Sequence, residues 1–524
     1  MRSLISILLL ISVSAFSATY YVAPSGSSDS NDGSIGSPWA TWQHAFATAN
    51  AGDTVYFRGG IWYPQEHISG NSILMIDPVV AGIGNTGNAS DPICYFNYPG
   101  ETPILDCDQV DTTGNRFNDG ISLRNTHFLK FKGLTIRNVY QPVSAELPIG
   151  ITTDNCSNLS LERMVIYNVQ GRGFHHVTQI GQDIPGEYVI TYDTLRVINC
   201  DIYDCFDALT DPPGNGADGF KYGSNSGGYA LFQGNRAWNC SDDGYDLGGQ
   251  GTVIIENCWS FNHGFENALD GDGFKFGGPL DSVGYPIRIV RNNLAVFNWG
   301  TGFFDLEYNG YYRNESRIYN NTAYKNSYSN NLSGGFSGVP YDGNSNSPWM
   351  LSKYRNNISY DNFDVIADLG VYTWYEEHHN TWDAVANSQA PFNEYTDTVT
   401  VSDADFVLAG GSTADSITAV AQLKQPRQSD GSLPVITFMH LVEGSDLIDA
   451  GAIDVAGLYI GYPDSLAYIY DPLNVSPDHI YPAYSGLAPD IGAFEFDPNT
   501  YDKPIKSSDG KFMVSIRGNL IIRE

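Results

Sequence analysis

The chain has 524 residues, with 59 acidic and 27 basic side chains and a formal net charge of −32. Such a negative field repels phosphate backbones, so the composition excludes a nucleic-acid-binding protein, which needs a basic face. Charged residues make up only 16% of the chain and hydrophobic residues 42%, which excludes an intrinsically disordered protein. The 55 glycines and the 13% of aromatic residues favour a β-rich fold with many turns.

The first 18 residues have the features of a signal peptide. Arg2 supplies a positive charge, residues 4–13 form an apolar run, and residues 15–18 are small residues suited to cleavage. The apolar run is too short to span a bilayer, and no later segment resembles a transmembrane helix. We therefore expect a secreted protein, a monomer with no membrane partner.

A short N-terminal cap is predicted directly after the signal peptide. Residues 20–22 and 52–60 have the pattern of early strands, and residues 39–50 that of a capping helix.

A six-residue pattern then recurs eight times between about residues 130 and 365, with starts 23 to 37 residues apart. Each copy has a bulky apolar residue at its fourth position and usually Asn or Cys at its sixth. The copies are short, rich in β-branched and aromatic residues, and bounded by Gly and Asn turns, which is typical of stacked β-coils. The sequence therefore predicts an all-β solenoid, and we assign residues 19–500 to it.

The fourth-position residues are predicted to form an interior stack, and the asparagines at the bends to form hydrogen-bonded ladders between coils. Cys205 and Cys240 share one repeat position on consecutive coils, and we expect both to be free thiols because strand neighbours usually stay reduced. The predicted interior stack consists of Ile136, Ile166, Tyr203, Trp238, Phe261, Val296, Tyr324 and Tyr360.

A second recurrence joins a glycine to an aromatic residue. The aromatic residue is expected to point into the core and the next residue outward, because side chains alternate along a strand. The predicted outward column is His175, Lys221, Asp246, Lys275 and Phe304. The motifs are Gly173-Phe-His175, Asp218-Gly-Phe-Lys221, Asp243-Gly-Tyr-Asp246, Asp272-Gly-Phe-Lys275 and Thr301-Gly-Phe-Phe304.

Four carboxylates, those of Asp218, Asp242, Asp243 and Asp246, are predicted to crowd beside this column. Like charges at such short range are costly unless a cation neutralises them. Oxygen ligands select a hard cation, and Ca²⁺ tolerates an irregular cage better than Mg²⁺ does. The sequence therefore predicts Ca²⁺ as cofactor, with an acidic solvated turn as the alternative.

A cation beside a lysine suits chemistry on an acidic sugar. The C5 proton of a uronate is α to a carboxylate, and a cation that neutralises this carboxylate stabilises the enolate-like state formed when the proton leaves. Lysine can act as the base because nearby Ca²⁺ and burial lower its pKa. Elimination of the C4 oxygen then cuts the chain without water. From the residues alone, Lys221 and Lys275 both remain candidates for the base.

Two segments after the repeats, residues 444–451 and 489–495, are predicted to close the solenoid. Residues 501–524 form a short tail of unknown role. From residue 503 on, this tail holds five basic and two acidic residues, the reverse of the charge balance in the body.

At the acidic motifs the sequence resembles polysaccharide lyase family 9, the calcium-dependent pectate and rhamnogalacturonan lyases. The resemblance spans nearly the whole mature chain, and it implies a right-handed parallel β-helix that degrades acidic plant cell-wall polysaccharide. It is carried by Tyr20-Tyr-Val-Ala-Pro-Ser-Gly26, Ala217-Asp-Gly-Phe220, Ser241-Asp-Asp-Gly-Tyr-Asp246, Asp272-Gly-Phe-Lys-Phe-Gly-Gly278 and Asp490-Ile-Gly-Ala-Phe-Glu495.

Carried over residue by residue, the resemblance implies that the four aspartates ligate Ca²⁺ and that Lys275 is the base. Lys221 then becomes a candidate for holding a substrate carboxylate. His175 in the outward column is a further substrate-binding candidate, and so is Tyr308 on an aromatic flank that could stack on sugar rings.

Two other functions are compatible with a solenoid. A β-helix glycoside hydrolase could use Asp242 and Asp243 as its acid pair, but it leaves the lysine recurrence unexplained. A non-catalytic polysaccharide-binding solenoid would tolerate the loss of Lys275. The sequence does not separate homogalacturonan from rhamnogalacturonan as substrate, or endo from exo cleavage.

Overall fold

The computed structural model describes most of the chain from residue 17 to residue 451 and short segments beyond. Residues 1–16 of the predicted signal peptide lie outside the described residues. In the described part, no helix has the length and the apolar character needed to cross a bilayer. The described residues are 17–111, 118–142, 147–177, 194–223, 228–249, 251–265, 270–277, 287–307, 314–327, 334–340, 350–362, 367–369, 374–381, 395–396, 400–409, 411–451, 490–496, 505–506, 512–516 and 519–523.

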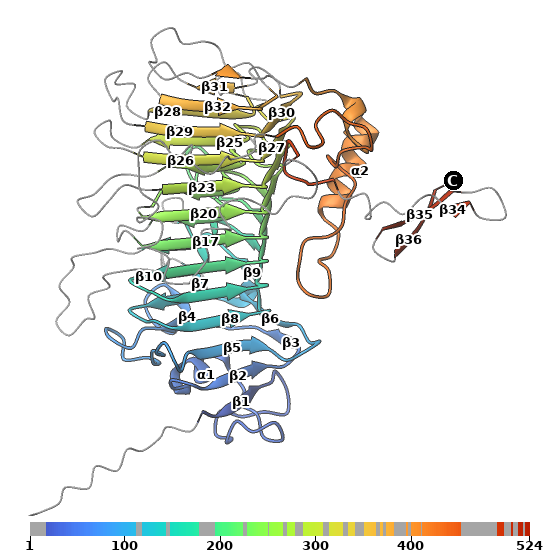
Figure 1. The fold of residues 1–524 in the computed structure, drawn as a ribbon. Helices are drawn as coiled ribbons and strands as arrows, with labels where there is room; N and C mark the ends of the chain where they lie inside the picture. The colour runs from blue at the N-terminus through green and yellow to red at the C-terminus, as the bar shows by residue number, and fades with distance from the viewer. Residues whose placement is uncertain are drawn as a thin grey trace, which may run out of the picture.

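Three parallel sheets run side by side along the axis of a solenoid, and each coil adds one strand to each sheet in turn (Figure 1). The predicted parallel β-helix is thus confirmed. The first sheet consists of β1 (Thr19–Val22), β2 (Thr54–Phe57), β5 (Ile93–Asn97), β8 (Leu129–Lys132), β11 (Leu159–Glu162), β14 (Thr194–Ile198), β17 (Tyr229–Gln233), β20 (Thr252–Glu256), β23 (Ile287–Arg291), β26 (Asn314–Tyr319), β29 (Met350–Arg355), β32 (Trp374–His378) and β33 (Tyr395–Thr396). The second sheet consists of β3 (Gly60–Trp62), β6 (Pro103–Asp106), β9 (Thr135–Val139), β12 (Val165–Val169), β15 (Asp201–Cys205), β18 (Arg236–Cys240), β21 (Trp259–Phe261), β24 (Leu294–Val296), β27 (Thr322–Tyr324) and β30 (Ile358–Tyr360). The third sheet consists of β4 (Ser72–Ile76), β7 (Asp119–Arg124), β10 (Ile149–Asp154), β13 (Arg172–Val177), β16 (Phe220–Tyr222), β19 (Tyr245–Leu247), β22 (Phe274–Phe276), β25 (Phe303–Glu307), β28 (Phe336–Pro340) and β31 (Ala367–Leu369).

The N-terminal cap is the predicted one. Helix α1 (Trp42–Thr48) begins after Thr41, whose side chain accepts a hydrogen bond from the backbone N–H of His44. It buries Trp42 and Phe46 against the first coils, where the ring of Trp42 lies 4.5 Å from that of Phe57. A short 3₁₀ helix, η1 (Cys107–Gln109), follows β6.

The Gly-aromatic motifs stack as predicted. Phe174, Phe220, Tyr245, Phe274 and Phe303 align in register on consecutive strands of the third sheet, and all five are buried. Neighbouring ring centroids from Phe220 to Phe303 lie 4.6 to 5.0 Å apart. This column fixes the register of the residues that follow each aromatic.

The predicted interior stack on the second sheet is wrong from Tyr203 onward. Ile166 aligns with Ile202, and Tyr203 aligns with Tyr167, one position later. The repeat that we assigned to start at Cys200 starts one residue earlier, so Cys200 is its second residue. The predicted register is therefore wrong by one residue from this coil on. From this coil on, the fourth-position residues point outward.

The outward residues of the second sheet do not pack in the solenoid interior. They are covered by the C-terminal segment. The interior positions of the second sheet hold small residues, because the backbone just ahead of the third-sheet strands comes close to them. A Cβ added at Gly219, Gly273 or Gly302 would lie only 3.1 Å from an alanine Cβ of the second sheet. The covered cluster includes Trp238, Phe261, Val296, Tyr324, Phe406, Leu423, Phe438, Leu447 and Ile491, with Tyr203 and Tyr360 packed against it.

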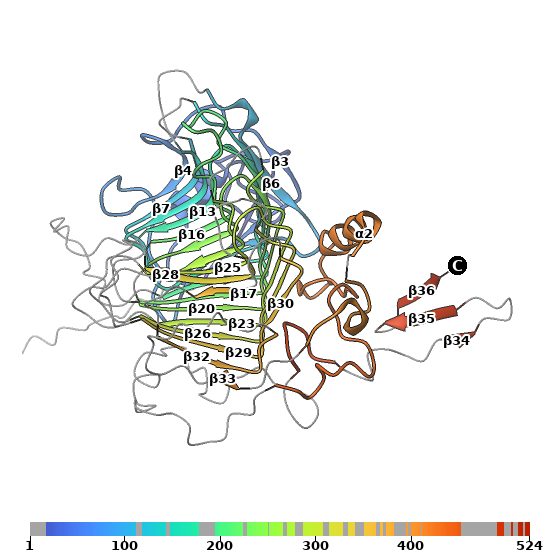
Figure 2. The same cartoon turned by 90° about the horizontal axis from the view of Figure 1, so that it is seen from above.

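Helix α2 (Thr413–Leu423), which the sequence analysis missed, lies in this segment beside the second sheet (Figure 2). It has a capping box in which Ser412 and Asp415 exchange hydrogen bonds. A 3₁₀ helix, η2 (Asp403–Asp405), precedes it. The predicted closing segments contribute Leu447 and Ile491 to the same cluster, so they close the outer face of the second sheet and not the end of the solenoid.

Two arginines fasten the C-terminal segment to the solenoid. Arg236 of β18 donates to both carboxylate oxygens of Asp201 at 2.8 Å and to the backbone oxygens of Leu423 and Gln425, also at 2.8 Å. From the other side, Arg427 donates to Asp201 at 2.7 Å. This buried ion-pair group therefore links α2 to β15 and β18.

Asparagine ladders run between coils as predicted. The amide of Asn293 donates to Asn321 at 3.0 Å, and that of Asn321 to Asn357 at 3.1 Å, with all three side chains buried. All seven cysteines are free thiols in the structure, including the register neighbours Cys205 and Cys240. In the predicted tail, β34 (Ile505–Lys506), β35 (Phe512–Ile516) and β36 (Asn519–Arg523) pair antiparallel.

Candidate functional site

The candidate site lies where three consecutive coils turn from the second sheet into the third. Asp218, Asp243 and Asp272 each stand two residues ahead of a third-sheet strand, at the entries to β16, β19 and β22. A glycine follows each aspartate because the turn leaves no room for a side chain. A Cβ on Gly244 would lie 2.0 Å from the Ser260 hydroxyl.

The outward column has the predicted register. His175 pairs with Lys221, Lys221 with Asp246, Asp246 with Lys275, and Lys275 with Phe304 on neighbouring strands. Two lysines thus flank one aspartate, and each lies one strand spacing, about 4.8 Å, along the axis from it.

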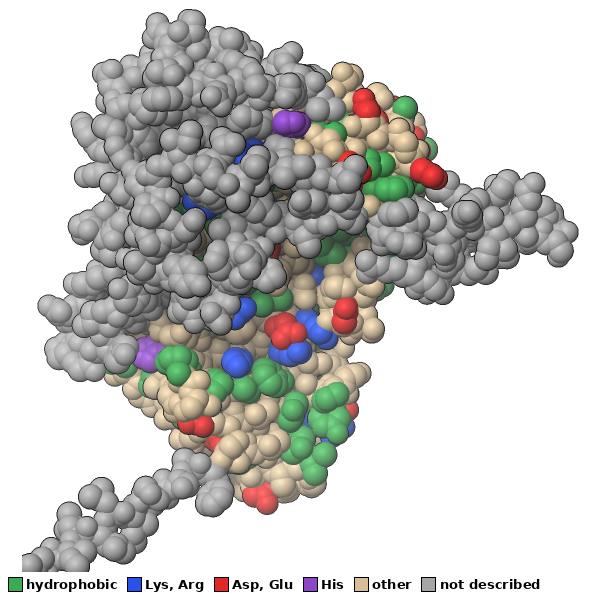
Figure 3. All heavy atoms as spheres, in the orientation of Figure 1, with side chains coloured by type: hydrophobic (Ala, Val, Ile, Leu, Met, Phe, Trp, Pro, Cys, Tyr) green, Lys and Arg blue, Asp and Glu red, His purple; other side chains and the backbone are tan. Residues whose placement is uncertain are grey.

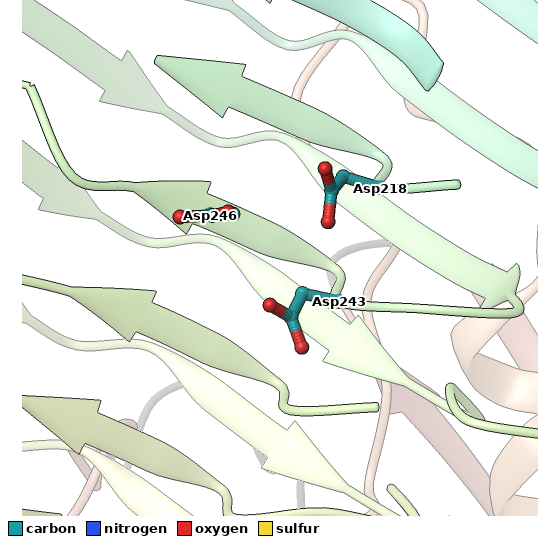
Figure 4. A group of neighbouring side chains, drawn as sticks. All are labelled: Asp218, Asp243 and Asp246. Atoms are coloured by element: carbon teal, nitrogen blue, oxygen red, sulfur yellow. The ribbon is translucent and has the colours of Figure 1, made fainter. Parts of the chain in front are cut away.

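Asp218, Asp243 and Asp246 form one carboxylate group. Each offers an oxygen within 4.8 Å of the others, and Figure 4 shows Asp218 and Asp243 at the starts of two neighbouring strands, with Asp246 further along the second. One carboxylate oxygen of Asp218, Oδ1, is buried and has no hydrogen-bond partner among the described residues.

Asp242 belongs to a second, overlapping group. It clusters with Asp243 and Asp270, so the four predicted ligands are divided between two groups that share Asp243. Its Oδ1 is buried and also lacks a hydrogen-bond partner in the described part of the chain. Burial raises the pKa of Asp242 well above its usual value, and the charge of Asp218 raises it further.

The two lysines neutralise these carboxylates. The Lys221 ammonium donates to Asp218 at 3.1 Å and to Asp246, while the Lys275 Nζ lies 3.2 Å from Asp243 Oδ2 and 2.9 Å from Asp270 Oδ2. Burial acts to lower the pKa of both lysines, but the carboxylate charges outweigh burial and raise it. For Asp246, burial acts to raise the pKa, and the charges of Lys221 and Lys275 outweigh it and lower it.

The donor set suits a hard cation. All the candidate ligands are carboxylate oxygens, and two of them are buried oxygens with no hydrogen-bond partner among the described residues. Such oxygens are costly to bury unless a cation or donor meets them. Ca²⁺ takes six to eight oxygen ligands in flexible geometry, so the residues present fit this ion.

Three residues of the site were missed by the sequence analysis. Arg172 lies 3.3 Å from Asp218 Oδ2, and Asp270 contacts Lys275. The Asp272 carboxylate accepts a hydrogen bond from the Thr301 backbone at 2.6 Å, and burial raises its pKa to about 7. Asp270 and Asp272 directly precede the Gly-Phe-Lys motif, so a second acidic pair was visible in the sequence there.

The predicted substrate-binding residues are only partly described. His175 lies beside Lys221, and burial together with the charges of Arg172 and Lys221 lowers the pKa of its imidazole to about 2. It is therefore neutral and able to accept or donate one hydrogen bond. Tyr308 lies outside the described residues. Trp299 is 40% exposed, and its backbone N–H donates to the carbonyl of His263, in the turn that leads toward Asp270.

Comparisons with known proteins place the chain in a family. The model of the Pel9A-like right-handed β-helix region matches residues 20–380. Pectate lyase L from Dickeya chrysanthemi is 30% identical over 494 residues, which cover 91% of this chain and 90% of that protein. Pectate lyase PEL9 from Emericella nidulans is 28% identical over 314 residues, which cover 55% of this chain and 69% of that protein.

Two solved structures have the same architecture. A crystal structure of pectate lyase Pel9A superimposes with a TM-score of 0.61 and 25% identity, covering 92% of this chain and 97% of that one. A rhamnogalacturonan lyase gives a TM-score of 0.61 at 24% identity, covering 81% of this chain and 97% of the other, and shows the shared fold. The chain therefore belongs to the Pel9A-like family of right-handed parallel β-helix proteins.

Proposed function

We propose that this protein is a secreted, calcium-dependent polysaccharide lyase that cleaves a pectic uronate polymer by β-elimination. The observation that carries the proposal is the position of Lys275, one strand from Asp246 and 3.2 Å from the carboxylate of Asp243. The carboxylates around it raise the pKa of Lys275. A hard cation held by these carboxylates would offset their charge and favour the unprotonated amine that abstraction of a proton α to a carboxylate requires.

In the proposed reaction Lys275 takes the C5 proton of a uronate. The C5–H electron pair forms the C4–C5 double bond, and the bond from C4 to the glycosidic oxygen breaks with its electron pair. The leaving oxygen takes up one proton, which balances the proton removed from C5, so that no water is consumed. Lys275 is the middle residue of β22, whose register is held by the stacked ring of Phe274. The base is therefore positioned by the core of the solenoid and not by a loop.

Asp218, Asp242, Asp243 and Asp246 would hold the calcium ion, and Asp270 belongs with Asp242 and Asp243 to the second of the two overlapping groups. When bound, the ion supplies positive charge that neutralises the substrate carboxylate and makes the C5 proton more acidic. Lys221 and Arg172 lie on the N-terminal side of the acidic group and are suited to pairing with the carboxylate of a neighbouring sugar.

Polygalacturonate is the substrate we propose first. The relatives that match most of the chain are named pectate lyases, and the resemblance to the rhamnogalacturonan lyase is one of fold. Trp299, which is 40% exposed, would stack on a sugar ring, and Tyr308 is predicted from the sequence to do the same. Secretion follows from the predicted signal peptide, and we expect the mature enzyme to act as a monomer.

An assay of the purified protein on several pectic polymers tests this proposal. Polygalacturonate should give products that absorb in the ultraviolet, because the new double bond is conjugated with the carboxylate, and a chelator should abolish the signal. Release of reducing ends without any increase in ultraviolet absorbance would instead assign the protein to the hydrolases. Absence of cleavage on polygalacturonate and rhamnogalacturonan, with calcium present, would contradict the enzymatic function itself.

A further inference from the structure

The outer face of the first sheet carries an unusual combination of side chains near its N-terminal end. Tyr21, Tyr56 and Phe96 align on the consecutive strands β1, β2 and β5, and none of the three is buried. The core does not use these rings, because the alternate residues Val55 and Tyr95 of the same strands point inward and are fully buried.

The three rings form a continuous aromatic surface. The centroids of Tyr21 and Tyr56 lie 5.9 Å apart in a stacked arrangement, and those of Tyr56 and Phe96 lie 6.4 Å apart. Tyr98 packs against Tyr56 at 6.0 Å and lies under the guanidinium of Arg58. Tyrosine combines an apolar ring face with a hydroxyl group, which suits contact with a sugar ring.

Basic side chains continue the same face on the next strands. Lys132 of β8 aligns with Phe96, and Lys130 lies beside it, while Arg196 of β14 lies two strands further along. We call Tyr21, Tyr56, Phe96, Lys130, Lys132 and Arg196 the aromatic-basic strip. Figure 3 shows lysine and arginine side chains on this face, with hydrophobic and acidic side chains among them.

Two of these cations have no anionic partner in the described part of the chain. No carboxylate lies within ion-pair distance of Lys130 or Arg196 among the residues that the structure describes, and the Nε of Arg196 is buried without a hydrogen-bond acceptor there. Lys132 pairs with Glu162 at 2.7 Å, and Glu162 is shared with Arg163, which also donates to the backbone of Asp430. A locally basic surface is unexpected in a chain with a net charge of −32.

The strip follows the solenoid axis in two adjacent columns of the same face. Tyr21, Tyr56, Phe96 and Lys132 align in one column, and Lys130 and Arg196 align in the other, two residues away along each strand. The strip extends over the six strands β1 to β14, which corresponds to about 24 Å at 4.8 Å per strand. A small anion would need one basic pocket, whereas a row of rings with cations beside and beyond it along the axis matches a polymer of acidic sugars. The strip belongs to the first sheet and the acidic group to the third, so a chain bound to the strip does not contact Lys275.

We propose that the aromatic-basic strip is a second, non-catalytic binding site for an acidic polysaccharide chain. The inference rests on the proposed function in one respect only, namely that the ligand has the chemistry of the proposed substrate. Sugar rings contact Tyr21, Tyr56 and Phe96, and uronate carboxylates pair with Lys130 and Arg196. Such a site keeps the enzyme on a polymer that its overall negative charge otherwise repels.

Affinity electrophoresis in gels with polygalacturonate tests the strip directly. The protein carries Lys275→Met and runs with a chelator, so that neither cleavage nor a metal-dependent contact contributes. We expect Lys130→Gln and Arg196→Gln each to weaken retention about two- to fivefold, the range of an exposed charge pair, and added salt to weaken it further. Tyr56→Ala should also weaken it, and a gel with neutral galactan should not retain the protein.

The matched control is Lys424→Gln, which removes the same charge from an exposed lysine at the end of α2. Retention of Lys130→Gln and Arg196→Gln equal to that of this control overturns the inference. A change of molecular mass in sedimentation caused by Lys130→Gln would mean that the strip binds a second copy, and this also overturns it.

The outcome can be separated from that of the proposed function. In the enzyme with Lys275 intact, Lys130→Gln should leave cleavage of short oligouronates unchanged and raise KM for the long polymer. If the enzyme cleaves uronate polymers and the variants are retained in the gel as strongly as the parent protein, the binding role of the strip is refuted and the proposed function stands. Weakened retention of the variants, in a protein that cleaves no uronate polymer, supports the strip and refutes the proposed function.

Discussion

Replacing Lys275 with Met tests two consequences of its position at once. The methionine keeps most of the volume and the unbranched shape of the side chain, and it removes the charge. In the unsubstituted protein the Lys275 ammonium group lies between Asp243 and Asp270 and competes with any cation for the Asp243 carboxylate. We therefore expect the variant to lose turnover and to bind calcium more tightly.

The sizes of both effects follow from the geometry. At 3.2 Å and an effective dielectric constant of about 20, the attraction between Lys275 and Asp243 is about 5 kcal/mol before desolvation. Breaking a buried pair of this kind has a net cost of about 3 kcal/mol. The chelated variant should lose stability by that amount, and its calcium affinity should rise by about 100-fold. Loss of a general base should lower kcat by about 10²- to 10⁴-fold, with little change in KM.

Calorimetric titration with calcium and initial rates from product absorbance measure these quantities at pH 9, with Lys221→Met as the matched control. A Lys275→Met enzyme of unchanged kcat would refute the assignment of the base. If Lys221→Met instead lost its turnover with binding intact, the base would lie on the neighbouring coil. Calcium affinity that falls in Lys275→Met would refute the competition for Asp243.

Chelation should abolish activity while the far-ultraviolet circular dichroism stays within a few per cent, because the sheets are held by their own core; global unfolding on chelation would contradict this. In chelator, thermal stability should fall between about pH 4 and pH 7. A carboxyl whose pKa is raised on folding stabilises the fold below its unfolded value near 4 and loses this contribution as the pH passes its folded value, about 7 for Asp272. Asp272→Asn should flatten the profile in scanning calorimetry, and an unchanged slope would exclude Asp272 as its source. Arg427→Ala should cost about 3 kcal/mol by leaving Asp201 partly unpaired, and should speed proteolysis within residues 411–451 without altering calcium affinity.

The third sheet could be predicted from the sequence because its marker is sterically fixed. Only glycine fits before each aromatic residue, so the Gly-aromatic motif recurs at one position of every coil and sets the register of Asp246 and Lys275. The second sheet lacks such a marker. Its apolar residues face a C-terminal segment that is distant in sequence, and an outward-facing Trp238 has the same local pattern as an inward-facing one.

The stacking of the aspartates on neighbouring coils could be predicted from the sequence, but the contacts between individual carboxylates could not. Repeat spacing brings Asp218 and Asp243 together, because they occupy equivalent turns on neighbouring coils. The division of the carboxylates into two groups depends on how Asp270 approaches from the loop between β21 and β22. That approach depends on the length and path of the loop, which no repeat determines.

The path of oxygen during cleavage tests the proposed chemistry most directly. Polygalacturonate is cut in water enriched in heavy oxygen, with calcium present, and the oligosaccharide products are weighed by mass spectrometry. Elimination at C4–C5 predicts unsaturated products with no heavy oxygen added at the cleavage step. Saturated products with one heavy oxygen from the solvent for each bond cleaved would mean hydrolysis, and they would contradict the assignment of Lys275 as the base of a lyase.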